Sequence, residues 1–154
     1  MQRIELDRTV SRAPDVVFDR LLDFEGYPRY SEYLRSVSAR GDREYELTFG
    51  WWKLSYDTRA RVTDRVRPRR IDWTVESDLE ASGRWLVEDR GQSTRIRFQA
   101  AYDPASLSSG AVSLPLGISL DWIRNRAEGL IQEEADRVMD RVVADLDQQA
   151  RSAK

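Results

Sequence analysis

The sequence predicts an α+β domain in which a curved antiparallel sheet of six to seven strands wraps around one long C-terminal helix. Residues 2–10 and 34–102 alternate apolar and polar side chains with a period of two, which is typical of strands covered on one face. Residues 119–149 contain no proline and carry apolar side chains at helical spacing. The 154 residues are enough for one domain, which we expect at 1–150, with a disordered tail at 151–154.

The segment after the first strand carries helix signals. Ser11 is the predicted N-cap of a helix that runs to about Phe24, with an apolar stripe along one side. Gly26-Tyr27-Pro28 is expected to break this helix, and a short second helical turn is expected at 29–33.

Turn sequences divide residues 34–102 into about six strands. Arg40-Gly41-Asp42, Arg67-Pro68-Arg69 and Arg90-Gly91-Gln92 combine the residue types that tight turns favour. One face of these strands is polar throughout, so the opposite face needs a cover. A helix at 119–149 would be about 45 Å long, which is enough to cross the sheet. A coiled-coil arm is the alternative for this helix.

The order of these elements, together with three segments, resembles a known superfamily. The segments are Val17-Phe18-Asp19-Arg20-Leu21-Leu22-Asp23-Phe24, Tyr27-Pro28-Arg29-Tyr30 and the closing Ala- and Glu-rich helix. Nearly the whole chain resembles the START-like (SRPBCC) superfamily, most closely its polyketide cyclase/dehydrase and coenzyme Q-binding branch. The resemblance implies a helix-grip fold, in which a seven-stranded sheet curls around the last helix and leaves a tunnel. Members of the superfamily bind sterols, phospholipids, quinones, polyketides or plant hormones, so the fold alone does not decide the ligand.

The composition excludes several kinds of catalytic site. The chain has no histidine and no cysteine, which removes the usual general base near neutral pH, the commonest metal ligand and the thiolate nucleophile. Its glycines stand singly, and its carboxylates do not cluster at a metal-binding spacing. We therefore assign no catalytic residue and expect no metal and no cofactor. The net charge of −2 also argues against a nucleic-acid partner.

Large aromatic residues occupy the covered face of the predicted sheet. Either these rings fill a closed core, or they line a cavity whose ligand or waters satisfy their polar ends. We favour the cavity, because Ala127 and Gly129 on the covering helix would leave room against the rings. The residues predicted to bind the ligand are Tyr45, Phe49, Tyr56, Trp73, Trp85, Phe98, Tyr102, Leu130 and Glu134.

Two charged residues fall at apolar positions of this pattern. Arg8 has the inward phase of the first strand, and Glu134 lies between Leu130 and Val138 on the apolar stripe of the helix. One alternative is that each side chain reaches out to solvent. Another is that it orients the polar group of a ligand, and a third is that the two charges neutralise each other inside the domain.

The apolar segment at 103–117 has no clear periodicity, and long loops of this kind often serve as lids. We expect a gate here; the alternative is that its side chains tuck under the edge of the sheet. At Trp51-Trp52, one of the two rings is expected to face outward, where it would contact a partner or, transiently, a membrane surface; the alternative is that it plugs the hairpin. The gate residues are Leu107, Val112, Leu114, Leu116 and Ile118.

Three functions compete. The first is a binding or carrier protein for a hydrophobic small molecule, such as a lipid, a quinone or a polyketide-like compound. The second is an aromatase/cyclase-type enzyme that acts on a polyketide through Tyr, Arg or Ser. The third is a ribosome- or protein-interaction module, for which the arginine-rich turn at 65–70 is the candidate patch. We adopt the first, because the aromatic face and the missing catalytic groups favour it over an enzyme.

The cellular setting is predicted from the absence of targeting signals. The N-terminus carries charges where a signal peptide needs an apolar run, and no window approaches the roughly 20 apolar residues of a membrane-spanning helix. We therefore expect a cytoplasmic protein that is a monomer or a weak dimer.

Overall fold

The computed structural model describes residues 2–51, 54–76, 79–106, 112–113 and 119–152. Over these residues the chain forms one sheet with helices on its concave side. In chain order the elements are β1 (Gln2–Val10), α1 (Pro14–Leu22), the 3-10 helix η1 (Phe24–Tyr30), β2 (Leu34–Ala39), β3 (Glu44–Trp51), β4 (Leu54–Val66), β5 (Arg70–Val75), β6 (Glu80–Asp89), β7 (Thr94–Asp103), the 3-10 helix η2 (Pro104–Ser106), β8 (Val112–Ser113) and α2 (Leu120–Ser152).

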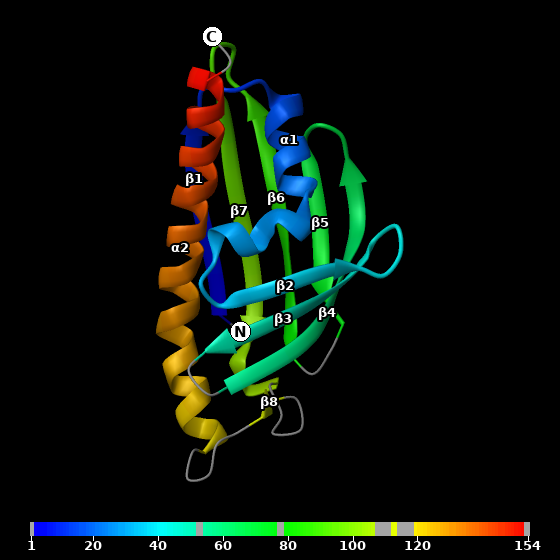
Figure 1. Ribbon diagram of the computed structural model, residues 1–154, viewed down its shortest axis with the longest axis vertical. Helices are drawn as coiled ribbons and strands as arrows, with labels where there is room; N and C mark the ends of the chain where they lie inside the picture. The colour runs from blue at the N-terminus through cyan, green and yellow to red at the C-terminus, as the bar shows by residue number, and fades with distance from the viewer. Residues whose placement is uncertain (1, 52–53, 77–78, 107–111, 114–118, 153–154) are drawn as a thin grey trace.

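The strands form a single antiparallel sheet in the order β1-β7-β6-β5-β4-β3-β2, and the short β8 pairs with β4 beside this path. The predicted curved sheet is therefore confirmed. Strands β5 to β7 follow the long axis of the molecule, whereas β2 and β3 cross them steeply (Figure 1). Register shifts between Leu34 and Ser36 in β2 and between Val62 and Asp64 in β4 mark bulges, which bend the strands where the sheet curls.

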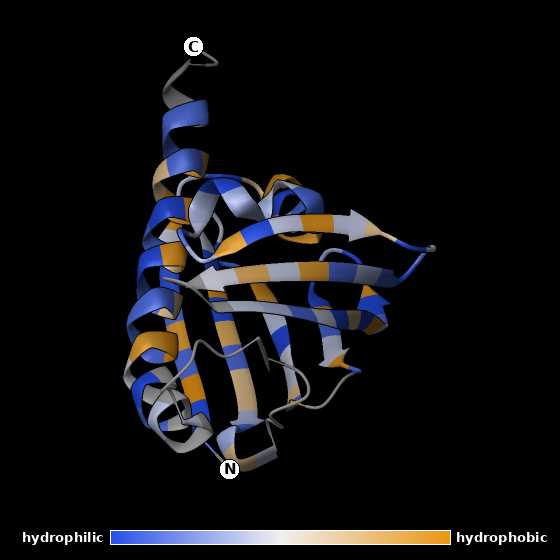
Figure 2. Ribbon diagram, turned by 60° about the horizontal axis from the view of Figure 1, so that its bottom comes forward, coloured by the Kyte–Doolittle hydropathy of each residue, from blue (hydrophilic) through white to orange (hydrophobic). Residues whose placement is uncertain are grey.

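Side chains alternate between the two faces of the sheet, as the period of two predicts. On β5, Ile71 is buried in the interior, while Asp72 forms ion pairs with Arg70 and Arg84 on the outer face. Figure 2 shows this alternation as bands of polar and apolar colour along the strands. The concave face is the apolar one, and it is the face that needs a cover.

The long helix α2 supplies this cover. It begins at Leu120, close to the predicted start, and runs alongside β1 over the open side of the curved sheet (Figure 1). A polar stripe follows its outward side in Figure 2. The helix packs on the sheet, so the alternative of a coiled-coil arm is wrong.

The N-terminal helical region differs in detail from the prediction. Ala13 rather than Ser11 precedes α1, and no side chain caps the helix, whose first residue is Pro14. The backbone N–H of Ser11 instead donates to the carboxylate of Asp147 on α2 at 3.0 Å. Ser11 is thus held against α2, which is a tertiary contact that the local capping signal does not contain.

The predicted break at 26–28 lies inside a helix. Phe24–Tyr30 forms η1, so the second helical segment comes earlier than the expected 29–33. The fixed φ of Pro28 suits a 3-10 helix, and the N–H of Gly26 bonds to the carbonyl of Asp23 at 3.1 Å. Residues that break an α-helix are thus accommodated by the tighter helix.

The interior has a packed end and a hollow end. At the packed end, α1 and the C-terminal half of α2 meet the inner face of the sheet, and the side chains there are almost fully buried. Toward the start of α2, the apolar residues at 130–138 are only half-buried, and the cavity described below begins there. The packed core comprises Val10, Val17, Phe18, Leu21, Ile71, Ile96, Met139, Val142 and Leu146.

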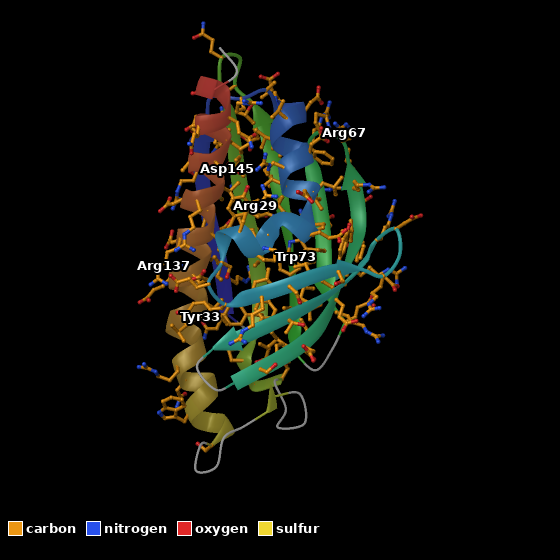
Figure 3. The ribbon with its side chains drawn as sticks, in the orientation of Figure 1. Arg29, Tyr33, Arg67, Trp73, Arg137 and Asp145 are labelled. Atoms are coloured by element: carbon orange, nitrogen blue, oxygen red, sulfur yellow. The ribbon has the colours of Figure 1, made fainter. Side chains whose placement is uncertain are left out.

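Ion pairs fasten α2 to the N-terminal elements. Arg8 of β1 donates to Asp140 at 2.9 Å and to Asp136 at 3.0 Å, and Arg20 of α1 pairs with Asp145. We call these contacts the helix clamp. Figure 3 shows Asp145 beside the N-terminal helices, toward the C-terminal end of α2. The clamp therefore holds the half of α2 that also carries the packed core.

Candidate functional site

A cavity of about 530 Å³ lies between the concave face of the sheet and α2. Its wall is overwhelmingly apolar and takes residues from β1, η1, β2 to β7 and α2. Pockets that bind small molecules have volumes of about 300–1,000 Å³, so this space is of the right size for one. The interior space that the aromatic pattern predicts is therefore present.

All nine residues that the sequence predicts to bind a ligand lie on the wall of this one cavity. Five different strands and α2 contribute them, which means that the folded sheet gathers residues spread over 90 positions of the chain. Their contact with a ligand stays a prediction. The nine residues are Tyr45 and Phe49 on β3, Tyr56 on β4, Trp73 on β5, Trp85 on β6, Phe98 and Tyr102 on β7, and Leu130 and Glu134 on α2.

Aromatic rings form two groups on the wall. In the first, the Phe98 ring neighbours Trp85 at a centroid distance of 4.7 Å and stacks with Trp73 at 6.2 Å. In the second, Phe49 and Tyr56 stack across β3 and β4 at 6.3 Å. Ring pairs of this geometry contribute roughly 0.5–1.5 kcal/mol beyond their buried area. The first group lies on β5 to β7 and the second on β3 and β4. Both groups present apolar surface to the cavity.

The polar end of Trp85 is satisfied within the protein. Its indole N–H donates to the hydroxyl of Tyr27, and this hydroxyl donates in turn to the backbone carbonyl of Leu21. Burial raises the pKa of Tyr27 well above the ordinary value of 10.0, which keeps the hydroxyl protonated. For this pair, the expectation that a ligand or water satisfies the buried polar ends is wrong.

Sequence analysis missed the contribution of η1 to the wall. Phe24 and Tyr27 both line the cavity, and Phe24 packs edge-on against Tyr45 at 4.9 Å. Their spacing of three residues places them on one side of a helix, but the segment 26–28 was expected to be a break. Smaller wall residues also have the inward phase of the strand alternation, but only large aromatic residues of the strands were predicted to bind a ligand. These smaller residues are Leu47, Ala60, Val62, Val75 and Ala100.

The room in the cavity does not come from Gly129. This residue is exposed, and a Cβ built on it would meet no atom within 4 Å. Leu130 and Ile131 take the inward positions of that helical turn, so the prediction that Gly129 opens the interior is wrong. The small residue of α2 on the wall is Ala135. The side chain of Ala127 lies outside the described residues.

Glu134 is the carboxylate that the wall contains among the described residues. Its side chain is only 13% exposed, and its Oε2 atom accepts a hydrogen bond from Arg137 at 3.2 Å. Arg8 is held by the helix clamp and pairs with Asp136 at 3.0 Å, so the alternative in which Arg8 and Glu134 neutralise each other is wrong. The two acidic residues 134 and 136 point in different directions, because two residues turn an α-helix by about 200°.

The gate prediction falls largely outside the described residues. Leu107, Leu114, Leu116 and Ile118 lie there, as does Trp52. For Val112 the structure gives the backbone, which pairs with Tyr56 as part of β8. Because Tyr56 lies on the cavity wall, β8 runs beside the cavity. Whether the segment acts as a gate stays a prediction.

Outside the cavity, the structure offers weaker candidates for a functional site. Arg67 pairs with Asp19 at 2.6 Å and Arg70 with Asp64 at 2.6 Å, so the arginine-rich turn at 65–70 is partly balanced by carboxylates. Among the described residues, no three acidic side chains are grouped as metal ligands would be. In the same part of the chain, none of the helices has a stretch long and apolar enough to span a membrane.

Comparisons with known proteins agree with this fold. The Zhui aromatase/cyclase from Streptomyces sp. R1128 is similar with a TM-score of 0.73 at 17% sequence identity, over 99% of this chain and 97% of that chain. A START superfamily protein from Mycobacterium smegmatis is similar with a TM-score of 0.61 at 15% identity, over 94% of this chain and 98% of that one. At these identities the likeness shows a shared helix-grip fold. A search of curated protein sequences finds no match.

The sequence itself matches one family model over almost its whole length. The match covers residues 1–143, from β1 through most of α2, and the model is described as polyketide cyclase/dehydrase and lipid transport. The matched region includes every residue named above as part of the cavity wall. The protein therefore belongs to the polyketide cyclase/dehydrase and lipid transport family.

Proposed function

We propose that the protein binds a hydrophobic small molecule, of the lipid, quinone or polyketide-like class, in the cavity between the sheet and α2. The observation that carries this proposal is the cavity of about 530 Å³ with its ring-lined wall. Well-packed protein interiors leave few spaces larger than a water molecule, so a space of this size favours a ligand over a closed core. Each Å² of apolar ligand surface buried there contributes roughly 25 cal/mol.

An aromatase/cyclase-type enzyme is the second candidate, and membership of the family favours it. Such an enzyme needs wall groups that exchange protons with the ligand. On the described wall, the hydrogens of Trp85 and Tyr27 already bond within the protein, and one carboxylate oxygen of Glu134 is already bonded by Arg137. These engagements support binding as the first function and catalysis as the second.

The test is a titration of tryptophan fluorescence with a decyl-substituted benzoquinone, an apolar probe that quenches indole emission on contact. Because Trp73 and Trp85 lie on the wall, we expect quenching at micromolar concentrations. The affinity should change little with salt, because the contacts are apolar. The probe should be recovered chemically unchanged; conversion of a polyketide substrate by the same protein would instead support the enzyme.

Two phenylalanine variants on α2 make the titration specific to the cavity. Ala135 lies on the wall, so Ala135→Phe should fill part of the space and weaken binding at least about tenfold. Ala144 is exposed on the same helix, and Ala144→Phe should leave the affinity unchanged. Emission that stays constant at saturating probe, or equal affinities for both variants, would contradict binding in the cavity. A salt-sensitive complex with ribosomes and no effect on emission would favour the interaction module instead.

A further inference from the structure

We propose that Glu134 accepts a hydrogen bond from a hydroxyl group of the bound molecule, so that the cavity selects apolar alcohols or phenols over molecules of the same shape without a donor. This inference rests on the proposed function and names the chemical class of its ligand. It depends on one buried carboxylate oxygen and on the polar groups around that oxygen.

The described wall carries polar side chains besides Glu134, which are Tyr27, Ser31, Tyr33, Tyr45, Ser55, Tyr56, Thr58, Arg61, Trp73, Trp85 and Tyr102. Arg61 touches the cavity, but its side chain is 52% exposed and lies 3.6 Å from Glu76 at the surface. The hydroxyl of Ser31 accepts the backbone N–H groups of Tyr33 and Leu34 at 3.2 Å each. Arg61 and Ser31 thus have partners elsewhere in the protein, whereas Glu134 has a buried oxygen that accepts no hydrogen bond from the described residues.

The carboxylate of Glu134 is held from one side only. Arg137 donates to Oε2 at 3.2 Å and also hydrogen-bonds the side chain of Tyr33, which lies close to it in Figure 3. The other oxygen, Oε1, is buried and accepts no hydrogen bond from the described residues. The Nη1 atom of Arg141 lies 3.9 Å from Oε1, which is too long for a hydrogen bond.

Arg141 is not available to approach Oε1 more closely. Its Nη1 atom donates to the backbone carbonyl of Tyr30 at 2.8 Å, and its Nη2 atom lies 3.7 Å from Glu32. The guanidinium is therefore held at the end of η1 and the residues just after it. A buried carboxylate oxygen without a donor is costly, so the site as built favours a donor arriving from the cavity.

The geometry points to a neutral hydroxyl as that donor. A carboxylate-headed molecule is an acceptor only and has no hydrogen to give to Oε1. The negative charge of Glu134 is already offset by Arg137, so a cationic head is not needed for charge balance. The terminal torsion of a glutamate is soft, so the carboxylate can turn an oxygen toward a hydroxyl without disturbing the helix.

The test compares decanol with decyl methyl ether, which has the same chain and an oxygen that cannot donate. Hydrogen bonds to a charged acceptor are strong enough for the protein to prefer the alcohol by about tenfold. Glu134→Met should reduce this preference to about one while the ether still binds. Glu134→Gln keeps a carbonyl acceptor and should retain part of the preference.

The matched control is Glu133→Met. Glu133 bonds the same Arg137 at 3.4 Å, but its side chain is 64% exposed and it is not on the wall. This variant should bind both probes as the unmodified protein does. Affinities are read by calorimetry and by displacement of the quinone probe, so that binding and selectivity are measured separately.

The outcomes separate this inference from the proposed function. Equal binding of decanol and the ether by the unmodified protein would overturn the role of Glu134 and leave the cavity function standing. A preference that survives in Glu134→Met would overturn it as well. If neither probe binds and the quinone leaves tryptophan emission unchanged, both the function and the inference fall. The comparison in the unmodified protein decides the matter even if Glu134→Met does not fold.

Discussion

The indole ring of Trp73 lies directly over Gly83, its register partner on the neighbouring strand. A Cβ built on Gly83 would come within 2.9 Å of Cε2 of the indole, still closer to Cζ2, and within 2.6 Å of the backbone oxygen of Gln99. Any side chain at residue 83 therefore collides with both a ring and a strand. Because Gly83 has no side chain, the Trp73 ring can lie over β6 at this point of the cavity wall.

Gly83→Ala is expected to destabilise the protein by about 1–3 kcal/mol, because the added methyl group overpacks the wall and forces the ring or the strand to move. Urea unfolding followed by fluorescence measures the loss, and near-UV circular dichroism reports the moved ring. The control is Gly41→Ala, since a Cβ on this exposed turn residue meets no atom within 4 Å. Identical unfolding curves for the two variants would contradict the close approach.

Truncations along α2 should distinguish its two ends. Leu146 is fully buried in the packed core, and Leu146→Ala should cost about 2–5 kcal/mol. Leu130 is half-buried and already borders empty space, so Leu130→Ala should cost only about 1 kcal/mol. Chemical denaturation of both variants tests this difference. A loss at Leu130 as large as that at Leu146 would mean that the hollow end is packed.

Buried tyrosines should make the fold sensitive to alkali. Burial raises the pKa of Tyr27 above the ordinary value of 10.0, and burial together with the hydrogen bond to Asp145 raises the pKa of Tyr30. The folded chain thus holds these protons more tightly than the unfolded chain. Their contribution is complete below about pH 10 and is lost as the pH rises from there through the raised pKa values.

The measurement is the free energy of unfolding at several values between about pH 8 and pH 11, with tyrosinate absorbance recorded in parallel. Tyr30→Phe should reduce the alkaline slope. At neutral pH the same variant should cost about 1–2 kcal/mol, because Asp145 and Arg20 lose the hydroxyl that bonds to both. A slope that is unchanged in both Tyr27→Phe and Tyr30→Phe would rule out these two groups as its source.

The helix clamp should respond to salt. Arg8→Met removes the contacts to Asp136 and Asp140 and should cost about 0.5–1 kcal/mol, a modest value because the side chains of all three residues are partly exposed. The difference should shrink at high ionic strength, since screening weakens the pairs in the unmodified protein. Arg3→Met, on the outer face of the same strand, serves as the control. Equal stability of the two variants at low salt would contradict a stabilising clamp.

The sequence predicts the sheet and its inward residues well, because a strand places every second side chain on one face whatever its neighbours are. This rule places Tyr45, Trp73 and Tyr102 on the covered face, and in the structure all three line the cavity. Helical phase is less certain, since an error of one residue turns a side chain by about 100°. Gly129 was assigned to the interior for this reason, although it faces outward.

Contacts between distant elements could not be predicted from local patterns. The role of Gly83 depends on a ring ten residues earlier in the chain, and the ring rests on it only after β5 and β6 pair. The partners of Arg8 lie more than a hundred residues away on α2. To predict them, the rotation of α2 about its own axis relative to β1 would have to be known. Such relationships follow from the assembled sheet and helix.

The arrangement of α2 has a consequence for how this protein can change over evolution. Asp136 and Asp140 bind β1, while Ala135 and Val138, which lie within two residues of them in sequence, face the cavity. Mutations can therefore reshape the inner side of the helix in small steps without loosening its attachment. Selection for a new ligand and selection for a stable fold act on different codons of one short stretch, so lineages with this helix can diversify in what they hold while they inherit the same scaffold.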